Sequence, residues 1–359
     1  MAQIDQFLKV LVEQSGSDLH LSTGSPPVIR VHGHLQRVKF RELAAKDMET
    51  LVYEIMEEDW RARFLDSQDF DFAYEIEGLA RFRVNVFWQR KGLAAVFRTI
   101  PATILSAEQL GLPDAVRKLC MLTRGLVLVT GPTGSGKSTT LAAMVDLINE
   151  TRQDHVITIE DPIEFTHPNK KCLINQREIG THTKSFANAL RAALREDPDV
   201  ILVGEMRDRE TIELGLTAAE TGHLVFGTLH TNSAPKTVDR IIDVFPADQQ
   251  EQIRSQLAES LKGVISQVLL RKKGGAGRVA ASEIMVGTPA ISNLIRENKI
   301  HQIPSMIQTG KKDGMQLMDQ HIMEFYMSQV IDATEAYMRA QNKATFREYL
   351  DKEPDGEFV

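Results

Sequence analysis

The sequence is poor in cysteine and lacks long apolar runs. Among its 359 residues only Cys120 and Cys172 are cysteines, and both lie in apolar surroundings without metal-ligand spacing. A disulfide framework is therefore excluded, and a reduced intracellular protein is the simple interpretation. No uninterrupted apolar run reaches the length of about 20 residues that a membrane-spanning helix needs.

Excess positive charge is also missing. The net charge is -7 and the sequence pI is near 5.9, so the composition does not indicate a nucleic-acid partner. The first residues carry Asp5 and Glu13 and no basic cluster, which argues against a signal peptide. We expect a cytoplasmic protein, and its length predicts two domains or three.

The first part of the chain predicts a small α+β domain over residues 1–100. Apolar residues at helical spacing open the chain, and the stretch "PVIRVHGHLQRV" predicts a hairpin that turns at Gly33. A single helix is expected near Met48 to Leu65. Strands are expected at 69–76, 80–88 and 93–100. Residues 101–113, with two prolines and weak periodicity, are expected to form a linker.

The pattern then changes to continuous apolar strands that alternate with helical stretches. This alternation predicts an α/β domain over residues 114–340, with a parallel sheet covered by helices on both faces. Beyond Phe245 the chain is expected to be mostly helical. Residues 341–359 are expected to form a polar C-terminal tail, whose last nine residues, "DKEPDGEFV", we expect to be mobile.

A phosphate-binding loop is the most specific motif. "GPTGSGKST" follows an apolar strand and opens a helix, which is the context that this Walker A pattern requires. Glycine allows a tight turn whose N–H groups face the phosphates, and the helix N-terminus adds partial positive charge. Lys137 should reach the β- and γ-phosphates of ATP, and the Ser138 hydroxyl should bind Mg²⁺. The expected nucleotide-binding residues are Gly131, Pro132, Thr133, Gly134, Ser135, Gly136, Lys137, Ser138 and Thr139.

Acidic residues follow two other apolar strands. The stretch "ITIEDPIEF" ends in Glu160, Asp161 and Glu164, at the edge where parallel sheets build ligand sites. Glu205 lies just past the end of another apolar stretch, Val200 to Val203. Many nucleotide hydrolases have an aspartate at the end of this strand, but here the position just before Glu205 is Gly204. Another strand ends at His230, a candidate γ-phosphate sensor. The alternative for the acids is that they cap helices or lie in a solvated loop. The alternative for His230 is a hydrogen-bonded core histidine.

Taken together, the motifs resemble the secretion-type hexameric ATPases, and within them the PilT-type motors that retract type IV pili. The resemblance is carried by the Walker A loop, "ITIEDPIEF", the atypical Walker B "VILVGEMRD" and "GTLHTNSA". Three further stretches are similar to the PilT type: "SDLHLSTGSPPVIRVHG", "AISNLIRE" and "GMQLMDQ". This resemblance implies a PAS-like N-terminal α+β domain followed by a RecA-like ATPase domain with a helical C-terminal part.

The resemblance also implies roles for the acids. Glu164 and Glu205 become the pair that handles Mg²⁺ and the attacking water. We assign the general base to Glu164 and polarisation of the magnesium shell to Glu205, with the reverse assignment left open. His230 becomes the sensor of the γ-phosphate.

Basic residues of the first domain are candidates for charge stabilisation. Arg81 and Arg83 share one face of a predicted strand, and Arg98 ends the partner strand. A solvated strand face is the alternative. In the similar family the first domain lies over the ATP and contributes such arginines, which favours Arg83 and Arg98 as catalytic residues.

A candidate coupling element lies in "AISNLIRE". Three apolar residues of this stretch, Ile291, Leu294 and Ile295, share one face of a short helix and are expected to pack inward. Arg296 and Glu297 then point elsewhere and are candidates for passing motion to the pilus machinery. Ser292 stands where the similar family usually has arginine.

The resemblance implies a homo-hexamer that uses ATP and Mg²⁺ and supports twitching motility. It also implies a place at the cytoplasmic face of the inner membrane, where the protein is held peripherally through an inner-membrane pilus platform protein.

Alternative functions are an accessory retraction ATPase and a secretion or pilus-extension ATPase. The secretion and extension relatives usually carry a four-cysteine zinc insert that two cysteines cannot supply. A nucleic-acid translocase would need a basic pore or binding module. A non-hydrolysing adaptor would not need both glutamates and His230.

Overall fold

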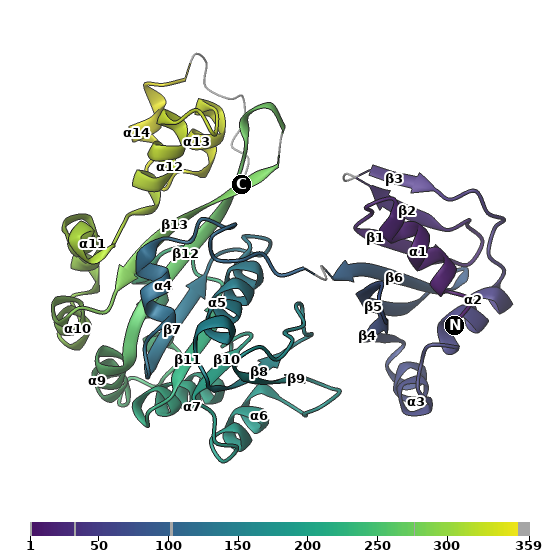
Figure 1. Cartoon of the computed structure of the whole chain (residues 1–359), viewed down its shortest axis with the longest axis horizontal. Helices are drawn as coiled ribbons and strands as arrows, with labels where there is room; N and C mark the ends of the chain where they lie inside the picture. The colour runs from purple at the N-terminus through teal and green to yellow at the C-terminus, as the bar shows by residue number, and fades with distance from the viewer. Residues whose placement is uncertain (1, 32–33, 101–102, 276, 351–359) are drawn as a thin grey trace. The chain divides into compact units, whose positions relative to one another are not determined.

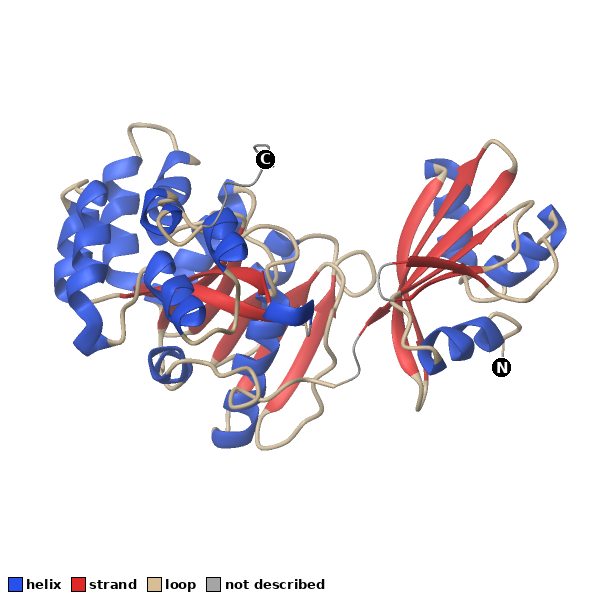
Figure 2. Ribbon diagram, turned by 90° about the horizontal axis from the view of Figure 1, so that it is seen from above, coloured by secondary structure: helices blue, strands red, loops and turns tan. Residues whose placement is uncertain are grey.

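The computed structural model describes residues 2–31, 34–100, 103–275 and 277–350. The chain divides into two compact units, unit 1 from Met1 to Thr103 and unit 2 from Ile104 to Val359. Figure 1 labels the elements of both units, and Figure 2 separates their helices from their strands by colour.

Unit 1 is built on a six-stranded antiparallel sheet with the order β3-β2-β1-β6-β5-β4. Its elements along the chain are α1 (Asp5–Glu13), β1 (Asp18–Ser22), β2 (Val28–Val31), β3 (His34–Arg37), α2 (Ala45–Tyr53), α3 (Glu58–Ser67), β4 (Asp69–Ile76), β5 (Ala80–Gln89) and β6 (Gly92–Ile100).

One face of this sheet forms the core of unit 1. Side chains alternate along β5, so that Phe82, Val84 and Val86 are fully buried while Arg83 is exposed. The buried face packs against apolar residues of the three helices, among them Leu8 and Phe64. The opposite face carries charged and polar side chains such as Arg83, Arg98 and Asn85 together with the apolar residues Phe87 and Val96.

The strands expected for unit 1 are confirmed, and one expected helix is corrected. The strands at 69–76, 80–88 and 93–100 are present, and β2 pairs with β3 as a hairpin whose turn at Gly33 lies outside the described residues. The single helix expected at 48–65 is wrong, because the chain leaves the helix after α2 and starts again at α3. Glu57 is extended and is followed by Glu58 and Asp59, acidic residues that favour a new helix N-terminus.

Unit 2 is built on a seven-stranded mixed sheet with the order β13-β12-β7-β11-β10-β8-β9. The strands β12 and β13 pair antiparallel, and all other neighbours pair parallel. Its strands are β7 (Gly125–Thr130), β8 (His155–Glu160), β9 (Leu173–Glu178), β10 (Val200–Val203), β11 (Leu224–Leu229), β12 (Leu261–Arg271) and β13 (Arg278–Val286).

The α-helices of unit 2 follow the parallel strands and then fill the C-terminal part. They are α4 (Asp114–Cys120), α5 (Lys137–Thr151), α6 (Phe186–Ala193), α7 (Arg209–Glu220), α8 (Ala234–Asp243), α9 (Gln250–Ser260), α10 (Pro289–Arg296), α11 (Ile303–Thr309), α12 (Met318–Met327), α13 (Ala333–Arg339) and α14 (Ala344–Arg347).

Helices cover both faces of this sheet, as the sequence predicts (Figure 1). Alternate strand residues divide between two cores. Val127 and Val129 of β7 pack with α4 and α5, whereas Leu126 and Leu128 pack in the core that contains α6 to α11. Because every β7 side chain is buried, this strand reads as a continuous apolar run in the sequence.

The chain beyond Phe245 is mostly helical as expected, from α9 to α14, but the expectation missed two strands. Strands β12 and β13 form a long antiparallel pair, and β12 adds to the parallel sheet beside β7. The far end of this pair carries α12, α13 and α14 in a small core of their own. Within the expected polar tail, Phe346 of α14 is buried in that core, a contribution of roughly 1.5–3 kcal/mol. Residues 351–359 lie outside the described residues.

Within the described residues, none of the helices combines the length and the apolar character that crossing a bilayer requires.

Candidate active site

The phosphate loop connects β7 to α5 at the carboxyl edge of the parallel sheet. Gly131 has a φ of 142° and Gly136 a φ of 87°, a region that other residues rarely adopt. A Cβ atom on Gly131 would lie 2.3 Å from the carbonyl oxygen of Gln267, so this position has no room for a side chain. Pro132 and Thr133, which the sequence also assigns to the nucleotide, are exposed.

The loop is braced by β12, a strand that sequence reasoning missed. The hydroxyl groups of Thr130 and Ser266 lie 2.7 Å apart, and Gln267 Nε2 donates to the Ser135 carbonyl at 2.7 Å. The polar pair Ser266-Gln267 interrupts an otherwise apolar stretch, and this is the signal that could have found it. The brace fixes the loop from the side opposite to its exposed tip.

Lys137 connects the loop to the acids. Its Nζ donates to the carbonyl oxygens of Gly131 at 2.9 Å and Pro132 at 3.2 Å. Burial lowers the pKa of the Lys137 ammonium, and the charges of Glu205 and Glu164 act in the opposite direction. These three charged groups therefore lie within electrostatic range of one another.

Glu205 and His230 meet at the ends of neighbouring parallel strands, β10 and β11. The imidazole Nε2 of His230 lies 2.9 Å from Glu205 Oε1, and the guanidinium of Arg207 pairs with the same carboxylate. Glu205 is largely buried, with 19% of its side chain exposed, whereas Arg207 is exposed. The sequence-predicted pair of Glu205 and His230 is thus brought into direct contact.

Gly204 explains why this strand does not end in an aspartate. A Cβ atom there would lie 3.1 Å from the Ile159 carbonyl oxygen and 3.3 Å from the Glu160 Cα. A side chain at this position would require the end of β8 to give by a few tenths of an ångström. The two strand ends therefore approach closely, and the acidic groups come from Glu205 and from the segment after β8.

The last residue of β8 and the loop that follows it carry two glutamates in different environments. Glu164 is exposed in the loop that follows the strand. The carboxyl of Glu160 is enclosed, with Thr158 Oγ1 donating to it at 2.6 Å and Gln176 Nε2 at 3.2 Å. Burial raises the pKa of Glu160, and the nearby charge of Glu164 acts in the same direction. Glu160 is thus partly buried, whereas Glu164 is exposed to solvent at the nucleotide edge.

The predicted magnesium site fits the chemistry of these residues. The Ser138 hydroxyl and the carboxylates of Glu164 and Glu205 are the oxygen donors that Mg²⁺ prefers. In the part of the chain that the structure describes, no three His, Cys, Asp or Glu side chains gather into a metal-holding cluster. Mg²⁺ in nucleotide enzymes typically takes one or two protein ligands and completes its shell with phosphates and water.

The arginines favoured as catalytic lie in unit 1, on the face of its sheet opposite the core. Arg83 and Arg98 are directly opposite each other in the β5–β6 pairing. Arg98 Nε donates to Asp18 Oδ1 at 2.9 Å, and Arg83 Nε lies 3.5 Å from Asp71 Oδ1. Both guanidinium groups are oriented by a carboxylate of the same sheet.

The candidate coupling pair lies at the end of α10. Ile291 and Ile295 are buried as predicted, in the core on the sheet face opposite α5. Arg296 and Glu297 are exposed, and Glu297 accepts from Lys299 Nζ at 2.7 Å. The structure thus places this pair apart from the residues around the phosphate loop.

Comparisons with known proteins agree with this geometry. The sequence profile of the family described as "Type II/IV secretion system protein" matches residues 1–355. A relative from Pseudomonas aeruginosa named "Type IV pilus retractation ATPase PilT" is 58% identical over 316 residues, which cover 88% of this chain and 92% of that protein. A "Twitching motility protein" of Neisseria gonorrhoeae is also 58% identical, over 88% of this chain and 84% of its own.

A solved structure extends the similarity to the fold. The structure titled "Crystal Structure of the Pilus Retraction Motor PilT and Bound ADP" superposes with a TM-score of 0.90. Its sequence is 49% identical, and the match covers 96% of this chain and 98% of that chain. The mixed sheet of unit 2 is consistent with the RecA-like fold of such a motor.

Proposed function

The chain belongs to the type II/IV secretion system protein family, and from this premise we propose that it is an ATP-hydrolysing motor that retracts type IV pili and supports twitching motility. One observation carries the chemistry. Lys137, Glu164, Glu205 and His230 gather around a phosphate loop at one edge of a parallel sheet. The solved PilT structure with bound ADP supports nucleotide binding at this edge.

ATP binding begins at the phosphate loop. The backbone N–H groups of Thr133 to Thr139, where the loop runs into the start of α5, would donate to the phosphates, whereas Pro132 has no N–H to offer. To reach the β- and γ-phosphates, Lys137 exchanges its bonds to the carbonyls of Gly131 and Pro132 for charge-assisted bonds to phosphate oxygens. The β12 brace keeps the backbone in place while the lysine side chain moves.

Hydrolysis needs an oriented water and stabilisation of the phosphate charge. Exposed Glu164 accepts the proton of the attacking water as general base, since Glu205 is already engaged by Arg207 and His230. His230 contacts the γ-phosphate and transmits its presence to Glu205 through the 2.9 Å contact between His230 Nε2 and Glu205 Oε1. Ser138 and Glu205 would hold Mg²⁺, which neutralises charge on the β- and γ-phosphates when bound.

The remaining assignments concern assembly and place. Arg83 and Arg98 complete the site with positive charge, as arginines from another domain or subunit do in many phosphoryl-transfer enzymes. We assign residues 1–100 to a PAS-like domain, 101–113 to a linker and 114–340 to the RecA-like ATPase domain, with a tail over 341–359. The motor acts as a homo-hexamer at the cytoplasmic face of the inner membrane, against a platform protein of the pilus machinery.

Three substitutions test the chemistry. Lys137→Ala should abolish tight ATP binding, because the phosphate charge loses its fixed partner. Glu164→Gln and Glu205→Gln should keep ATP binding and lose turnover by about 10²-fold or more, the usual range for removing a general acid or base or a stabilising charge. ATP affinity and steady-state phosphate release measure the two effects separately.

The control is Glu213→Gln, which neutralises an exposed glutamate of α7 outside the site and should leave the rate unchanged. Turnover at the parent rate in both site glutamine variants would contradict this active site.

A further inference from the structure

Two side chains of β9 hold the backbone on either side of Glu164. The N–H of Ile163 donates to Glu178 Oε2 at 3.0 Å, and Gln176 Nε2 donates to the Phe165 carbonyl at 2.8 Å. One neighbouring strand therefore fixes the backbone of Ile163 and of Phe165, the residues before and after the proposed general base, although the Glu164 side chain itself is exposed.

Gln176 makes two further hydrogen bonds in addition to the one with Phe165. Besides Phe165, its Nε2 donates to Glu160 Oε1 at 3.2 Å, and its Oε1 accepts from the His167 N–H at 2.8 Å. One amide thus ties the end of β8 to two points of the loop that follows it. Both hydrogens of its amide nitrogen and its oxygen have named partners, so the orientation of this amide is fixed.

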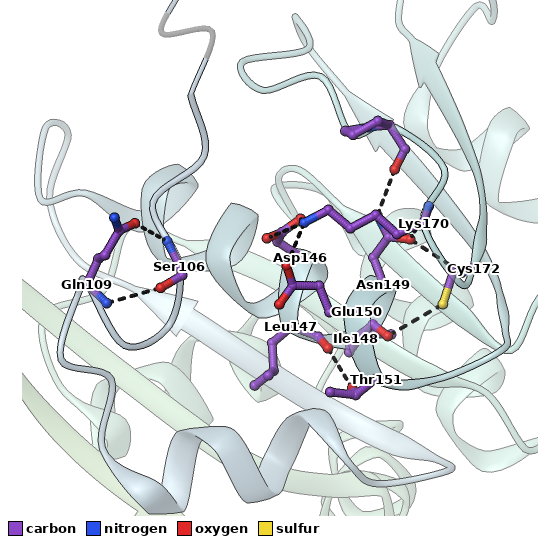
Figure 3. Close-up of polar contacts among 11 residues, drawn as sticks. Ser106, Gln109, Asp146, Leu147, Ile148, Asn149, Glu150, Thr151, Lys170 and Cys172 are labelled. Atoms are coloured by element: carbon purple, nitrogen blue, oxygen red, sulfur yellow. Dashed lines mark hydrogen bonds and ion pairs between the residues drawn. The ribbon is translucent and has the colours of Figure 1, made fainter.

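The other end of the same loop has a separate anchor on α5 (Figure 3). Asn149 Nδ2 donates to the Pro168 carbonyl at 2.7 Å, and Asn149 Oδ1 accepts from the N–H of Lys170 at 3.0 Å. Lys170 Nζ in turn pairs with Asp146 and Glu150 at 2.8 Å each. This anchor fixes residues 168–172 and makes no contact with the peptides that flank Glu164.

We infer that Gln176 is a positioning residue for hydrolysis, which holds Glu164 at the distance and angle that the attacking water requires. The inference rests on the role proposed for Glu164. A general base on a loop works only if its backbone is held in place, because a displacement near 1 Å can cost about 10²-fold in rate. Gln176 supplies that restraint from a strand that carries no catalytic group of its own.

The test compares Gln176→Met in the full-length protein with the parent. Methionine keeps the length of the side chain and removes all three hydrogen bonds. We expect unchanged ATP affinity, since the phosphate loop is not touched, and a single-turnover rate lower by on the order of 10-fold to 100-fold. Gln176→Glu keeps the acceptor for the His167 N–H, loses the donor to Phe165, and should shift the rate in the same direction.

A double-mutant comparison separates positioning from general destabilisation. In the Glu164→Gln background, Gln176→Met should cause no further loss of rate, because the group that it positions is already inactive. Asn149→Ala is the matched control. It removes an amide from the other end of the same loop and should lower Tm at least as much as Gln176→Met while retaining most of the single-turnover rate.

The outcomes distinguish the two levels of the proposal. If Glu164→Gln itself hydrolyses ATP normally, the assigned role of Glu164 fails, and the inference fails with it. If Glu164→Gln is inactive but Gln176→Met turns over at the parent rate, only the positioning role is overturned. Equal loss of rate in Gln176→Met and Asn149→Ala, or an additive loss in the double variant, would also overturn it, since loop order alone would then explain the effect.

Discussion

At the scale of single residues, the neighbourhood of Glu160 separates two acids that differ little in sequence. Glu160 and Glu164 belong to one short stretch, yet the first is enclosed by Thr158 and Gln176 and the second is open to solvent. Burial raises the pKa of Glu160, so its neutral form is favoured in the folded protein. The environment thus gives Glu160 a raised pKa that its place in the sequence does not reveal.

The raised pKa of Glu160 predicts that the free energy of unfolding depends on pH. Because the pKa of Glu160 is raised above its ordinary value of 4.5, its favourable contribution is complete below that value and is lost as the pH rises through the raised pKa. Glu160→Gln keeps an acceptor oxygen for Thr158 and cannot ionise, so it should raise Tm relative to the parent at pH 8.

The same variant should gain little at pH 4.5, where Glu160 of the parent is protonated. Thermal unfolding of nucleotide-free protein at the two pH values measures the difference. A Tm change that is equal at both pH values, or a loss of stability at pH 8, would contradict an ionisation cost at this position.

At the scale of elements, the sequence predicts the parallel strands that alternate with helices, but it does not predict the antiparallel pair of β12 and β13. Strand β7 is recognised because a motif follows it, but β12 is buried on both faces and reads as an apolar run that also fits a buried helix. Its strand form depends on pairing with β7 far back in the sequence. The brace on the phosphate loop and the positioning role of β9 escaped prediction for the same reason, since both depend on contacts between distant segments.

Motif residues, by contrast, need only local information. Lys137 and Ser138 are fixed by the spacing of the loop, and Glu205 by its place after four buried residues. Gln176 has no distinctive chemistry, and only the register of β9 against β8 reveals that it reaches Glu160.

The helix α10 carries the prediction that separates ATP hydrolysis from mechanical work. Ile291 and Ile295 hold the helix in the core, while Arg296 and Glu297 remain exposed. Arg296→Ala combined with Glu297→Ala should therefore leave folding, ring assembly and ATPase activity largely intact. Pilus retraction in cells should fail, because domain motion produces work only through an element that couples to it.

Twitching and ATPase activity are measured on the same variant. Lys311→Ala with Asp313→Ala removes an equally exposed pair of opposite charges from the same unit and should behave as the parent. Normal twitching in the α10 variant would show that Arg296 and Glu297 do not couple ATP hydrolysis to retraction. Loss of ATPase activity would show that the two residues are needed for the structure of the motor.

At the scale of the whole molecule, the two units have separate cores, and the catalytic loop and acids all belong to unit 2. We therefore expect unit 2 to fold without unit 1. If Arg83 and Arg98 complete the site, a chain that begins at Ile104 should bind ATP but hydrolyse it more slowly, by about 10³-fold where an arginine supplies the transition-state charge.

Because the shorter chain can also lose ring assembly, Arg83→Ala with Arg98→Ala in the full-length protein is the companion variant. It should reproduce the loss of rate while Asp71→Ala, which removes only the partner of Arg83, has a smaller effect. Full ATPase activity in either the shorter chain or the double arginine variant would show that Arg83 and Arg98 are solvent-exposed residues without a catalytic role.

The position of β12 beside β7 also governs the order in which the protein matures during synthesis. The phosphate loop leaves the ribosome early, but Ser266, which contacts Thr130, follows 136 residues later. Strand β7 lies between β11 and β12, so both of its neighbours are translated after it. A nascent chain that stops before β12 therefore carries a complete nucleotide-binding motif with an open strand edge and no brace, a form prone to wrong pairing. The ability to bind ATP in the final geometry arrives only with the last third of the chain.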